Sequence, residues 1–230
     1  MAKRRDPAPI GQAADQAPAA RKATTGPTHD EAERQRLVRE RREADGRRRS
    51  HELWQASGVP DRHAAGVENR SKAWGAKRDE LEAMLGTGFL VALIGGRGSG
   101  KTQMAVALIR DRVHARPPVV AQYVRAMDVF LTIREAYRSD GPSERDQINR
   151  FVRPGLLVID EAHVRGETAW EDRMLTHLID LRYGAGVDTL LVSNETHAEF
   201  KASIGPSIYS RLIETGGVIE CNWESFRRPR

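Results

Sequence analysis

The sequence lacks a long apolar run. Over its 230 residues, no such stretch is longer than the one at residues 89–94, which is far below the roughly 20 residues that a helix needs to cross a bilayer. The amino terminus, MAKRRDPAPIGQAAD, has no apolar stretch of the kind found in secretory signals. Both absences argue against a membrane or secreted protein, and we expect a cytoplasmic one.

Cysteine is nearly absent as well. The one cysteine, Cys221, cannot form an internal disulfide, and it leaves no set of thiolates for a zinc site. The seven histidines never approach the H-E-x-x-H spacing of a metal-binding helix. We therefore expect Cys221 to be a structural thiol in a strand, and most histidines to lie on the surface or in loops.

A strong overall charge is also missing. The formal net charge is +5, and residues 1–52 contribute 13 Lys and Arg against 9 Asp and Glu, so that four of the five charges lie there. The rest of the chain is nearly neutral, which argues against a protein that coats nucleic acid through its overall field. Any contact with DNA phosphates must come from a local basic patch.

The amino-terminal part has few large apolar side chains. Residues 1–27 are rich in Ala, Pro, Gly, Gln and Thr, which predicts disorder because such a segment buries too little surface to offset its ordering entropy. A capping-box pattern from Thr28 to Glu31 then predicts a helix through EAERQRLVRERREAD, with Leu37 and Val38 as its main apolar residues. This helix is either a solvated element or an arm that binds a partner.

Turn-forming residues follow the charged helix. Gly46 precedes three arginines, and Ser57, Gly58 and Pro60 come shortly after them. We place a domain boundary there, between a flexible, basic, partly helical arm over residues 1–56 and a compact domain over residues 57–230.

Apolar runs alternate with helical stretches in this domain. A helix that contains Trp74, Leu81 and Leu85 comes first. Five short runs follow, at residues 89–94, 119–124, 156–159, 189–192 and 218–220. Apolar strands that alternate with helices predict an α/β fold, in which helices cover both faces of a five-stranded parallel sheet.

The loop after the first run contains the phosphate-binding motif G-x-x-x-x-G-K-[ST]. Its glycines let successive backbone N–H groups turn toward phosphates, and a helix that begins near Lys101 adds its N-terminal dipole. We expect Lys101 to reach the β- and γ-phosphates of ATP and Thr102 to ligate Mg²⁺. The predicted nucleotide-binding residues are Gly95, Gly96, Arg97, Gly98, Ser99, Gly100, Lys101 and Thr102.

Polar residues at later strand ends complete a candidate catalytic set. In LLVIDEAH, Asp160 is predicted to hold Mg²⁺ and Glu161 to polarise the attacking water as general base, which favours hydrolysis over phosphoryl transfer to a small molecule. Asn194, at the end of TLLVSN, is predicted to hydrogen-bond the water or the γ-phosphate. Arg211, in SIYSRL, is a candidate arginine finger for a neighbouring subunit's site, which implies a homo-oligomer.

This set of residues resembles the AAA+ ATPases, and among them the DnaC-type replicative helicase loaders and the related IstB-type transposition helpers. The resemblance covers residues 55–230 and rests on GGRGSGKT, LLVIDEAH, Asn194, the SRL run, the ending VIECNWESFRR and the entry SGVPDRHAAGVEN. It implies a P-loop core with strand order 5-1-4-3-2 and ATP bound between subunits.

The resemblance also implies that a helix over residues 127–138 faces single-stranded DNA. Its candidate phosphate contacts are Arg125, Arg134 and Arg138. An ordinary amphipathic helix that covers the sheet would show the same pattern, so both interpretations stay open.

The sequence departs from the family at both ends. Many AAA+ proteins continue into a helical lid with a second sensor arginine, whereas this chain stops after the fifth run, so we expect no lid and a sensor that is absent or replaced by Arg227 or Arg228. Some loaders have an amino-terminal zinc-binding segment. The arm here has no cysteine, so a helicase contact would be helical or disordered.

Four functions are compatible with the motifs. The leading hypothesis is a Mg²⁺-dependent ATPase that binds a replicative helicase through residues 1–56 and places it on single-stranded DNA. The alternative is a transposition helper that assembles on duplex DNA and recruits a transposase. A small-molecule kinase and a nucleotide-gated adaptor without hydrolysis are the other two.

Overall fold

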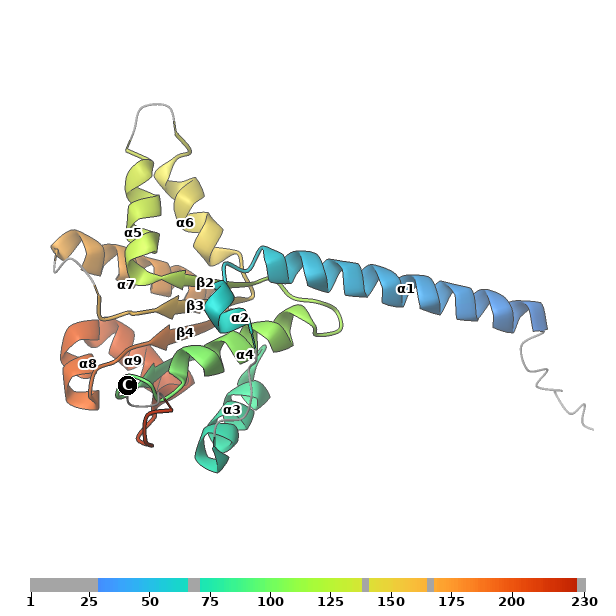
Figure 1. Ribbon diagram of the computed structural model, residues 1–230. Helices are drawn as coiled ribbons and strands as arrows, with labels where there is room; N and C mark the ends of the chain where they lie inside the picture. The colour runs from blue at the N-terminus through green and yellow to red at the C-terminus, as the bar shows by residue number, and fades with distance from the viewer. Residues whose placement is uncertain (1–28, 66–70, 138–140, 165–167, 227–230) are drawn as a thin grey trace, which may run out of the picture. The chain divides into compact units, whose positions relative to one another are not determined.

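The computed structural model describes residues 29–65, 71–137, 141–164 and 168–226 (Figure 1). The predicted disorder of residues 1–27 falls outside these ranges, as do Thr28, Arg138, Arg227 and Arg228. The chain divides into two units, Met1–Arg41 and Arg42–Arg230, and the division falls inside the first helix.

The first helix, α1, covers His29–Gln55. In the first unit, its side chains from residue 30 to residue 41 are exposed, including the apolar Leu37 and Val38. Arg36 pairs with Glu40 one turn later, with 3.5 Å between Nε and Oε1. Such pairs stabilise an isolated helix by only a few tenths of a kcal/mol, about 0.2–0.5 each. The charged helix predicted from the sequence is therefore present, and its described part in this unit has no buried face.

Gly46 does not interrupt α1, although the sequence indicated a change of organisation there. Glycine inside a helix costs about 1 kcal/mol relative to alanine. Later in the helix, Leu53 is only 7% exposed and packs in the same apolar cluster as Trp74. The helix ends where Ser57 Oγ donates a hydrogen bond to the Trp54 carbonyl at 2.7 Å. The domain boundary near residue 57 stays a prediction.

The second unit is built on a parallel sheet of five strands. They are β1 (Leu90–Ile94), β2 (Ala121–Arg125), β3 (Leu156–Asp160), β4 (Asp188–Val192) and β5 (Gly217–Glu220). Their order across the sheet is β2-β3-β4-β1-β5, and every neighbouring pair is parallel. This is the predicted order 5-1-4-3-2 read from the opposite edge. All residues of β1, β3 and β4 are buried, which explains their continuous apolar runs.

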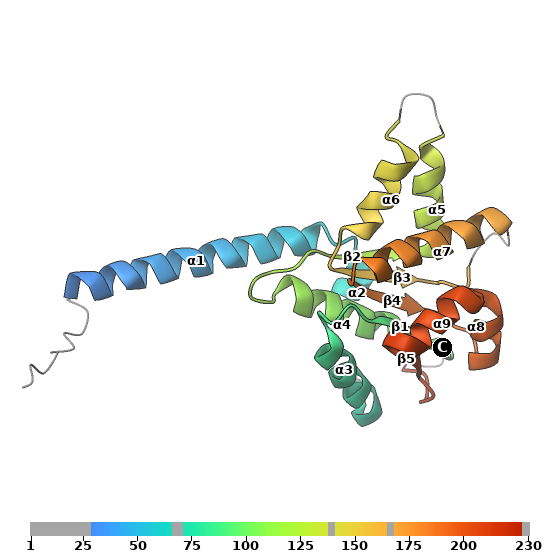
Figure 2. The same cartoon turned by 180° about the vertical axis from the view of Figure 1, so that it is seen from behind.

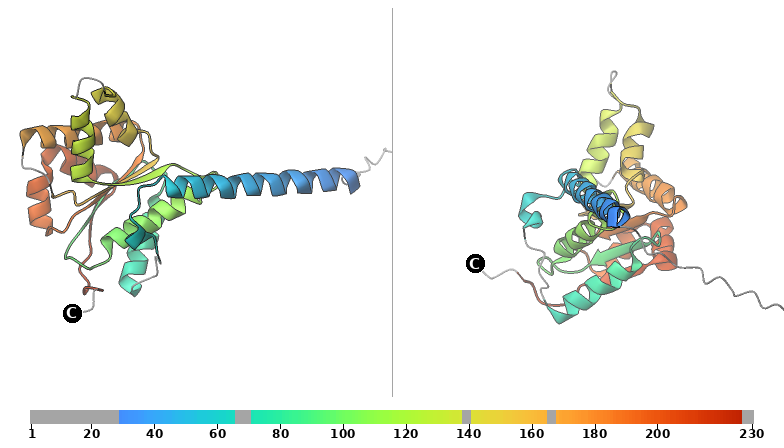
Figure 3. Two further views of the ribbon diagram at one scale, coloured as in Figure 1. Left: turned by 45° about the horizontal axis from the view of Figure 1, so that its top comes forward. Right: turned by 90° about the vertical axis from the view of Figure 1, so that its right-hand side faces the viewer.

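Helices cover both faces of the sheet, as predicted (Figures 2 and 3). They are α2 (Asp61–Ala64), α3 (Lys72–Met84), α4 (Lys101–Val113), α5 (Ala126–Glu135), α6 (Glu144–Val152), α7 (Ala169–Gly184), α8 (His197–Ile204) and α9 (Pro206–Thr215). One apolar cluster joins the sheet to α5 through α9. A second joins it to α3, α4 and the end of α1. The helix expected over residues 127–138 is α5, and it begins and ends earlier than predicted.

Cys221 is buried, as expected for a structural thiol, but it lies one residue after β5 rather than in a strand. Its N–H still donates to the Ile94 carbonyl at 2.8 Å, which continues the pairing of β5 with β1. Among the described residues, no helix is long and apolar enough to span a membrane.

Candidate functional site

A cleft of about 550 Å³ opens beside the carboxyl ends of the strands. Ligands of open parallel sheets bind in this position. The cleft is lined by Arg62, His63, Arg97, Gly98, Gly100, Lys101, Thr102, Gln103, Tyr123, Arg125, Asp160, Glu161, His163, Val164, Asn194 and Phe226. Most residues that are predicted to take part in nucleotide binding and hydrolysis therefore line a single cleft.

The phosphate loop connects β1 to α4, and its shape depends on glycine. Gly95 has a φ of 124°, and a Cβ there would lie 2.9 Å from the Cys221 carbonyl oxygen. Gly100 is the residue before α4 and has a φ of 80°. L-residues with side chains rarely adopt such angles. The motif glycines therefore allow the loop to adopt this conformation, and they would also let a phosphate approach its backbone closely.

Lys101 lies inside this loop. Its side chain is only 4% exposed, and Nζ donates to the carbonyl oxygens of Gly95 at 2.7 Å and Gly96 at 2.8 Å. Nζ also lies 3.3 Å from Ser99 Oγ. The ammonium group is thus held by the loop whose N–H groups would bind phosphates, and its contact with the β- and γ-phosphates stays a prediction.

Thr102 and Asp160 meet across the cleft floor. Thr102 Oγ1, on α4, donates to Asp160 Oδ2, at the end of β3, at 2.9 Å. A hydroxyl and one carboxylate are oxygen ligands of the kind that Mg²⁺ uses together with substrate phosphates and water. No group of three or more His, Cys, Asp or Glu side chains forms a metal site within the described ranges, and a magnesium–nucleotide site does not need one. The donor set fits the predicted ion.

Tyr123 is a site residue that the sequence did not indicate. Its hydroxyl, from β2, donates to Asp160 Oδ2 at 2.7 Å. Burial, followed by the negative charge of Asp160, raises the pKa of Tyr123, so the phenol stays protonated as a donor. A tyrosine inside an apolar run is typical of a strand that packs against the core. Only the pairing of β2 with β3 places its hydroxyl on this carboxylate.

Glu161 and Asn194 face the same cleft from neighbouring strand ends. Glu161 is exposed and has a φ of 55°, and no other described non-glycine residue has a positive φ. Its backbone N–H donates to Asp160 Oδ1 at 2.8 Å. The N–H of Asn194 lies 3.5 Å from His163 Nδ1. The structure brings the predicted base and the predicted sensor together, and their roles stay predictions.

The short helix α2 adds polar groups to the cleft that no motif indicated. His63 Nδ1 lies 3.0 Å from Gln103 Nε2, and both residues line the cleft with Arg62. Arg110 further fastens this segment to α4 by donating to the Ala64 carbonyl at 2.7 Å. The only sequence feature in this region was the entry stretch SGVPDRHAAGVEN.

Arg211 does not line this cleft. It lies on α9, where NH1 donates to the Ser207 carbonyl at 2.9 Å and NH2 pairs with Asp180 Oδ1 at 3.1 Å. Its guanidinium lies 5.5 Å from the ring centre of Tyr183. The structure separates Arg211 from the other predicted catalytic residues, which agrees with a residue that acts on a second subunit.

The arginines predicted to contact DNA have different surroundings. Arg125 lines the nucleotide cleft beside Asp160 and pairs with Asp128 at 2.9 Å. Arg134 pairs with the buried Glu171 at 3.0 Å and lies over the Trp170 ring at 4.7 Å. Both are thus engaged within the chain, and Arg138 lies outside the described residues.

Similarity to known proteins agrees with this geometry. A model of the family described as IstB-like ATP binding protein matches residues 21–230. The replicative helicase loader DnaC of Escherichia coli strain K12 is 24% identical over 161 residues, which are 70% of this chain and 65% of DnaC. The chain therefore spans just under two thirds of the length of that relative.

Solved structures show the same fold. A crystal structure of the DnaC helicase loader has a TM-score of 0.57 at 13% identity and covers 73% of this chain and 97% of its own. AMPPCP-bound DnaA from Aquifex aeolicus has a TM-score of 0.55 at 16% identity, with 67% and 47% covered. The predicted α/β fold around a five-stranded parallel sheet is thus confirmed.

Proposed function

The chain belongs to the family of IstB-like ATP-binding proteins, and we propose that it is a Mg²⁺-dependent ATPase that loads a replicative helicase onto single-stranded DNA. One observation supports hydrolysis above all: a single cleft contains the phosphate loop, the contact between Thr102 and Asp160, and Glu161. Triphosphate hydrolysis needs these groups for binding, for the metal ion and for attack by water.

Each residue has a separate task in this proposal. The loop N–H groups and the ammonium of Lys101 bind the β- and γ-phosphates. Thr102 and Asp160 would hold Mg²⁺, which when bound would supply positive charge beside the phosphate oxygens. Glu161 accepts the proton of the attacking water, and Asn194 hydrogen-bonds that water or the γ-phosphate.

Arg211 completes the site of a second copy of the chain. Its guanidinium approaches the γ-phosphate bound by the neighbour and stabilises the charge of the transition state. The location of Arg211 outside its own cleft supports this assignment. A homo-oligomer, formed with ATP or on the helicase, is then required for fast hydrolysis.

The loader role is supported by the likeness to DnaC and by the exposed face of α1. Leu37 and Val38 are adjacent exposed apolar residues on a charged helix, as a helix that binds a partner would present them.

The loader role is tested by co-purification of the full chain with the replicative helicase of its host. The double variant Leu37→Asp with Val38→Asp should lose the helicase, whereas Ile213→Asp, at an exposed apolar position on α9, should retain it. Undiminished capture of the helicase by residues 42–230 would refute a role for the part of the arm that ends at Arg41, and capture by residues 57–230 would refute the role of the whole arm.

DNA binding is the second part of the loader proposal. Arg125, Arg134 and Arg138 are the candidate phosphate contacts for single-stranded DNA. Arg134 pairs with the buried Glu171, whereas Arg125 pairs with the more exposed Asp128, so charge removal at Arg125 disturbs the core less and is the cleaner test. Arg125→Gln should weaken binding of single-stranded DNA, and the slope of affinity against salt concentration should fall by about one.

The main alternative is a transposition helper that acts on duplex DNA. The match to the IstB-like family over residues 21–230 favours it. It predicts a preference for duplex over single-stranded DNA, assembly along the duplex and capture of a transposase instead of a helicase. Both roles place the protein with DNA in the cytoplasm, and the same co-purification distinguishes them.

A further inference from the structure

Three successive carbonyl groups of the phosphate loop accept hydrogen bonds from outside the loop. The Gly98 oxygen accepts from the backbone N–H of Phe226 at 2.9 Å. The Ser99 oxygen accepts from Nε1 of Trp223 at 2.8 Å, and the Gly100 oxygen from Nε1 of Trp74 at 3.1 Å. Two of the three donors are therefore indole N–H groups, and they come from segments before and after the sheet.

These contacts contribute to the orientation of the loop N–H groups. In a planar trans peptide unit, the carbonyl of one residue and the N–H of the next point in opposite directions. A donor that holds the Ser99 carbonyl on one side turns the Gly100 N–H to the other side. The bond from Trp74, together with the bond from the Met104 N–H of α4 to the same carbonyl at 2.9 Å, does so for the Lys101 N–H. Phosphate binding by this loop depends on such N–H groups.

We propose that Trp74 and Trp223 are positioning residues that hold the peptide units of the phosphate loop in the orientation that binds nucleotide phosphates. Neither residue lines the cleft, so each acts through the loop and not by contact with the nucleotide. This inference deepens the proposed function and rests on ATP binding in this cleft.

Close packing between the loop and these donors supports the assignment. Gly100 is so near them that a Cβ at this position would lie 3.0 Å from Trp74 Nε1 and 3.2 Å from Cδ2 of Phe226. Trp74 is only 2% exposed, and a buried indole N–H requires an acceptor. The Gly100 carbonyl is that acceptor, so this contact provides the hydrogen bond that the buried indole N–H needs.

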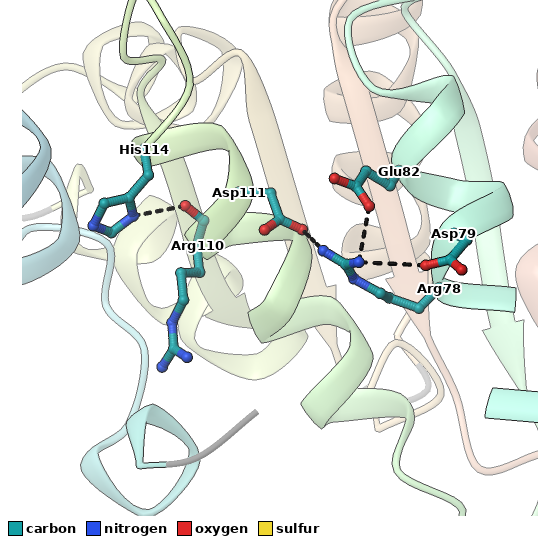
Figure 4. A network of polar contacts seen from close by, with 6 residues as sticks. All are labelled: Arg78, Asp79, Glu82, Arg110, Asp111 and His114. Carbon is teal, nitrogen blue, oxygen red and sulfur yellow. Dashed lines mark hydrogen bonds and ion pairs between the residues drawn. The ribbon is translucent and has the colours of Figure 1, made fainter. Parts of the chain in front are cut away.

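Each tryptophan is itself anchored to the core. Trp74 belongs to α3, which Arg78 joins to α4 by donating to Asp111 Oδ2 at 2.6 Å (Figure 4). The same guanidinium pairs with Glu82 on α3 at 2.8 Å. Trp223 follows Cys221, whose N–H bonds to the end of β1. Both donors therefore belong to segments that are themselves bonded to elements outside the loop.

The test compares phenylalanine variants of the full chain. Trp223→Phe and Trp74→Phe keep an aromatic ring and remove the N–H. The control is Trp170→Phe, because that ring packs on Phe130 and Arg134, outside the cleft. Affinity for a fluorescent non-hydrolysable ATP analogue is measured by titration, and the thermal midpoint is measured without nucleotide. We expect Kd to rise about fivefold in each loop variant and to stay within twofold of the parent in the control.

Kinetics distinguish positioning from a general loss of structure. In both loop variants KM for ATP should rise by the same factor as Kd, whereas kcat should change less than twofold. The proposal is overturned if Trp223→Phe, at the half-buried position, binds the analogue as the parent does, or if Trp170→Phe loses as much affinity. Trp223→Phe decides the matter if the buried Trp74→Phe does not fold. A parent chain that binds ATP without hydrolysing it would refute the ATPase proposal but not the positioning role. The ratio of Kd between each tryptophan variant and the parent would still report on the loop.

Discussion

The nucleotide cleft and the surroundings of Arg211 differ in how their charged groups are held. In the cleft, Lys101 and Asp160 are buried and bonded to other site residues, so the binding geometry exists within one chain. Arg211 is instead bonded to its own helix and to Asp180, away from the cleft. Nucleotide binding is therefore expected of a single chain, whereas under the proposed function fast hydrolysis is expected to require a second chain and the release of Arg211 from Asp180.

Replacing Arg211 tests this difference most strongly. Arg211→Ala should lower the ATPase rate of the assembled oligomer by about 1,000-fold, because an arginine finger contributes that much or more to kcat. Affinity for ATP should stay unchanged, as measured by titration. Arg173→Ala, an exposed position on α7, is the matched control and should keep the full rate.

Mixing two inactive variants sharpens the comparison. Lys101→Ala should not bind ATP, but it still presents Arg211. Arg211→Ala binds ATP, but it lacks the finger. A mixture should hydrolyse ATP at a rate that neither variant reaches alone. If the mixture stays as slow as its parts, Arg211 does not act between subunits.

Glu161→Gln separates binding from chemistry within the cleft. Without a general base, the rate should fall by about 100- to 1,000-fold, and ATP affinity should remain because the loop and Asp160 are intact. Glu80→Gln, on the exposed side of α3, provides the control. Equal turnover in the Glu161 variant would exclude this residue as the base.

Tyr123→Phe should have a smaller effect. Loss of one hydrogen bond to Asp160 leaves those from Thr102 and from the Glu161 N–H, so we expect the Mg²⁺ concentration for half-maximal activity to rise about fivefold. Tyr137→Phe removes an exposed phenol bonded to Glu144 and should change nothing. An unchanged Mg²⁺ requirement in the Tyr123 variant would show that this hydroxyl does not support the metal site.

The smallest effect concerns Cys221. Burial raises the pKa of its thiol to about 11, so iodoacetamide at pH 8 should leave it unmodified in the folded chain and modify it after unfolding. Because the folded pKa is the higher one, the stability that this group contributes is complete below the unfolded pKa and is lost as pH rises toward 11. In Cys221→Ala, the thermal midpoint should therefore fall less steeply over this range. Rapid labelling of the folded chain would contradict the burial.

Local sequence patterns predicted most of the cleft. The glycines of the phosphate loop, Lys101 and the acidic pair Asp160 and Glu161 are consecutive or nearly so, and each follows an apolar run whose burial in a parallel sheet is apparent from composition. Strand order followed from the resemblance, and the structure confirms it.

Residues that support the cleft from a distance could not be predicted. Tyr123 reaches Asp160 across 37 positions of sequence, Trp74 reaches Gly100 across 26, and Trp223 reaches Ser99 across 124. In the sequence, Tyr123 and Trp74 have the appearance of ordinary core aromatics, and Trp223 was noted only as part of the ending VIECNWESFRR. The continuation of α1 through Gly46 was missed for a related reason, since Leu53 packs against the core formed by later segments.

At Glu161, thermal stability and turnover place opposite demands on the residue, because its backbone has a positive φ. A left-handed backbone costs an L-residue roughly 1–2 kcal/mol, and the folded chain bears this strain whether or not water is being activated. Glycine or asparagine would relieve it. A laboratory selection for heat resistance alone would therefore favour Glu161→Gly and would, at the same step, remove the proposed general base.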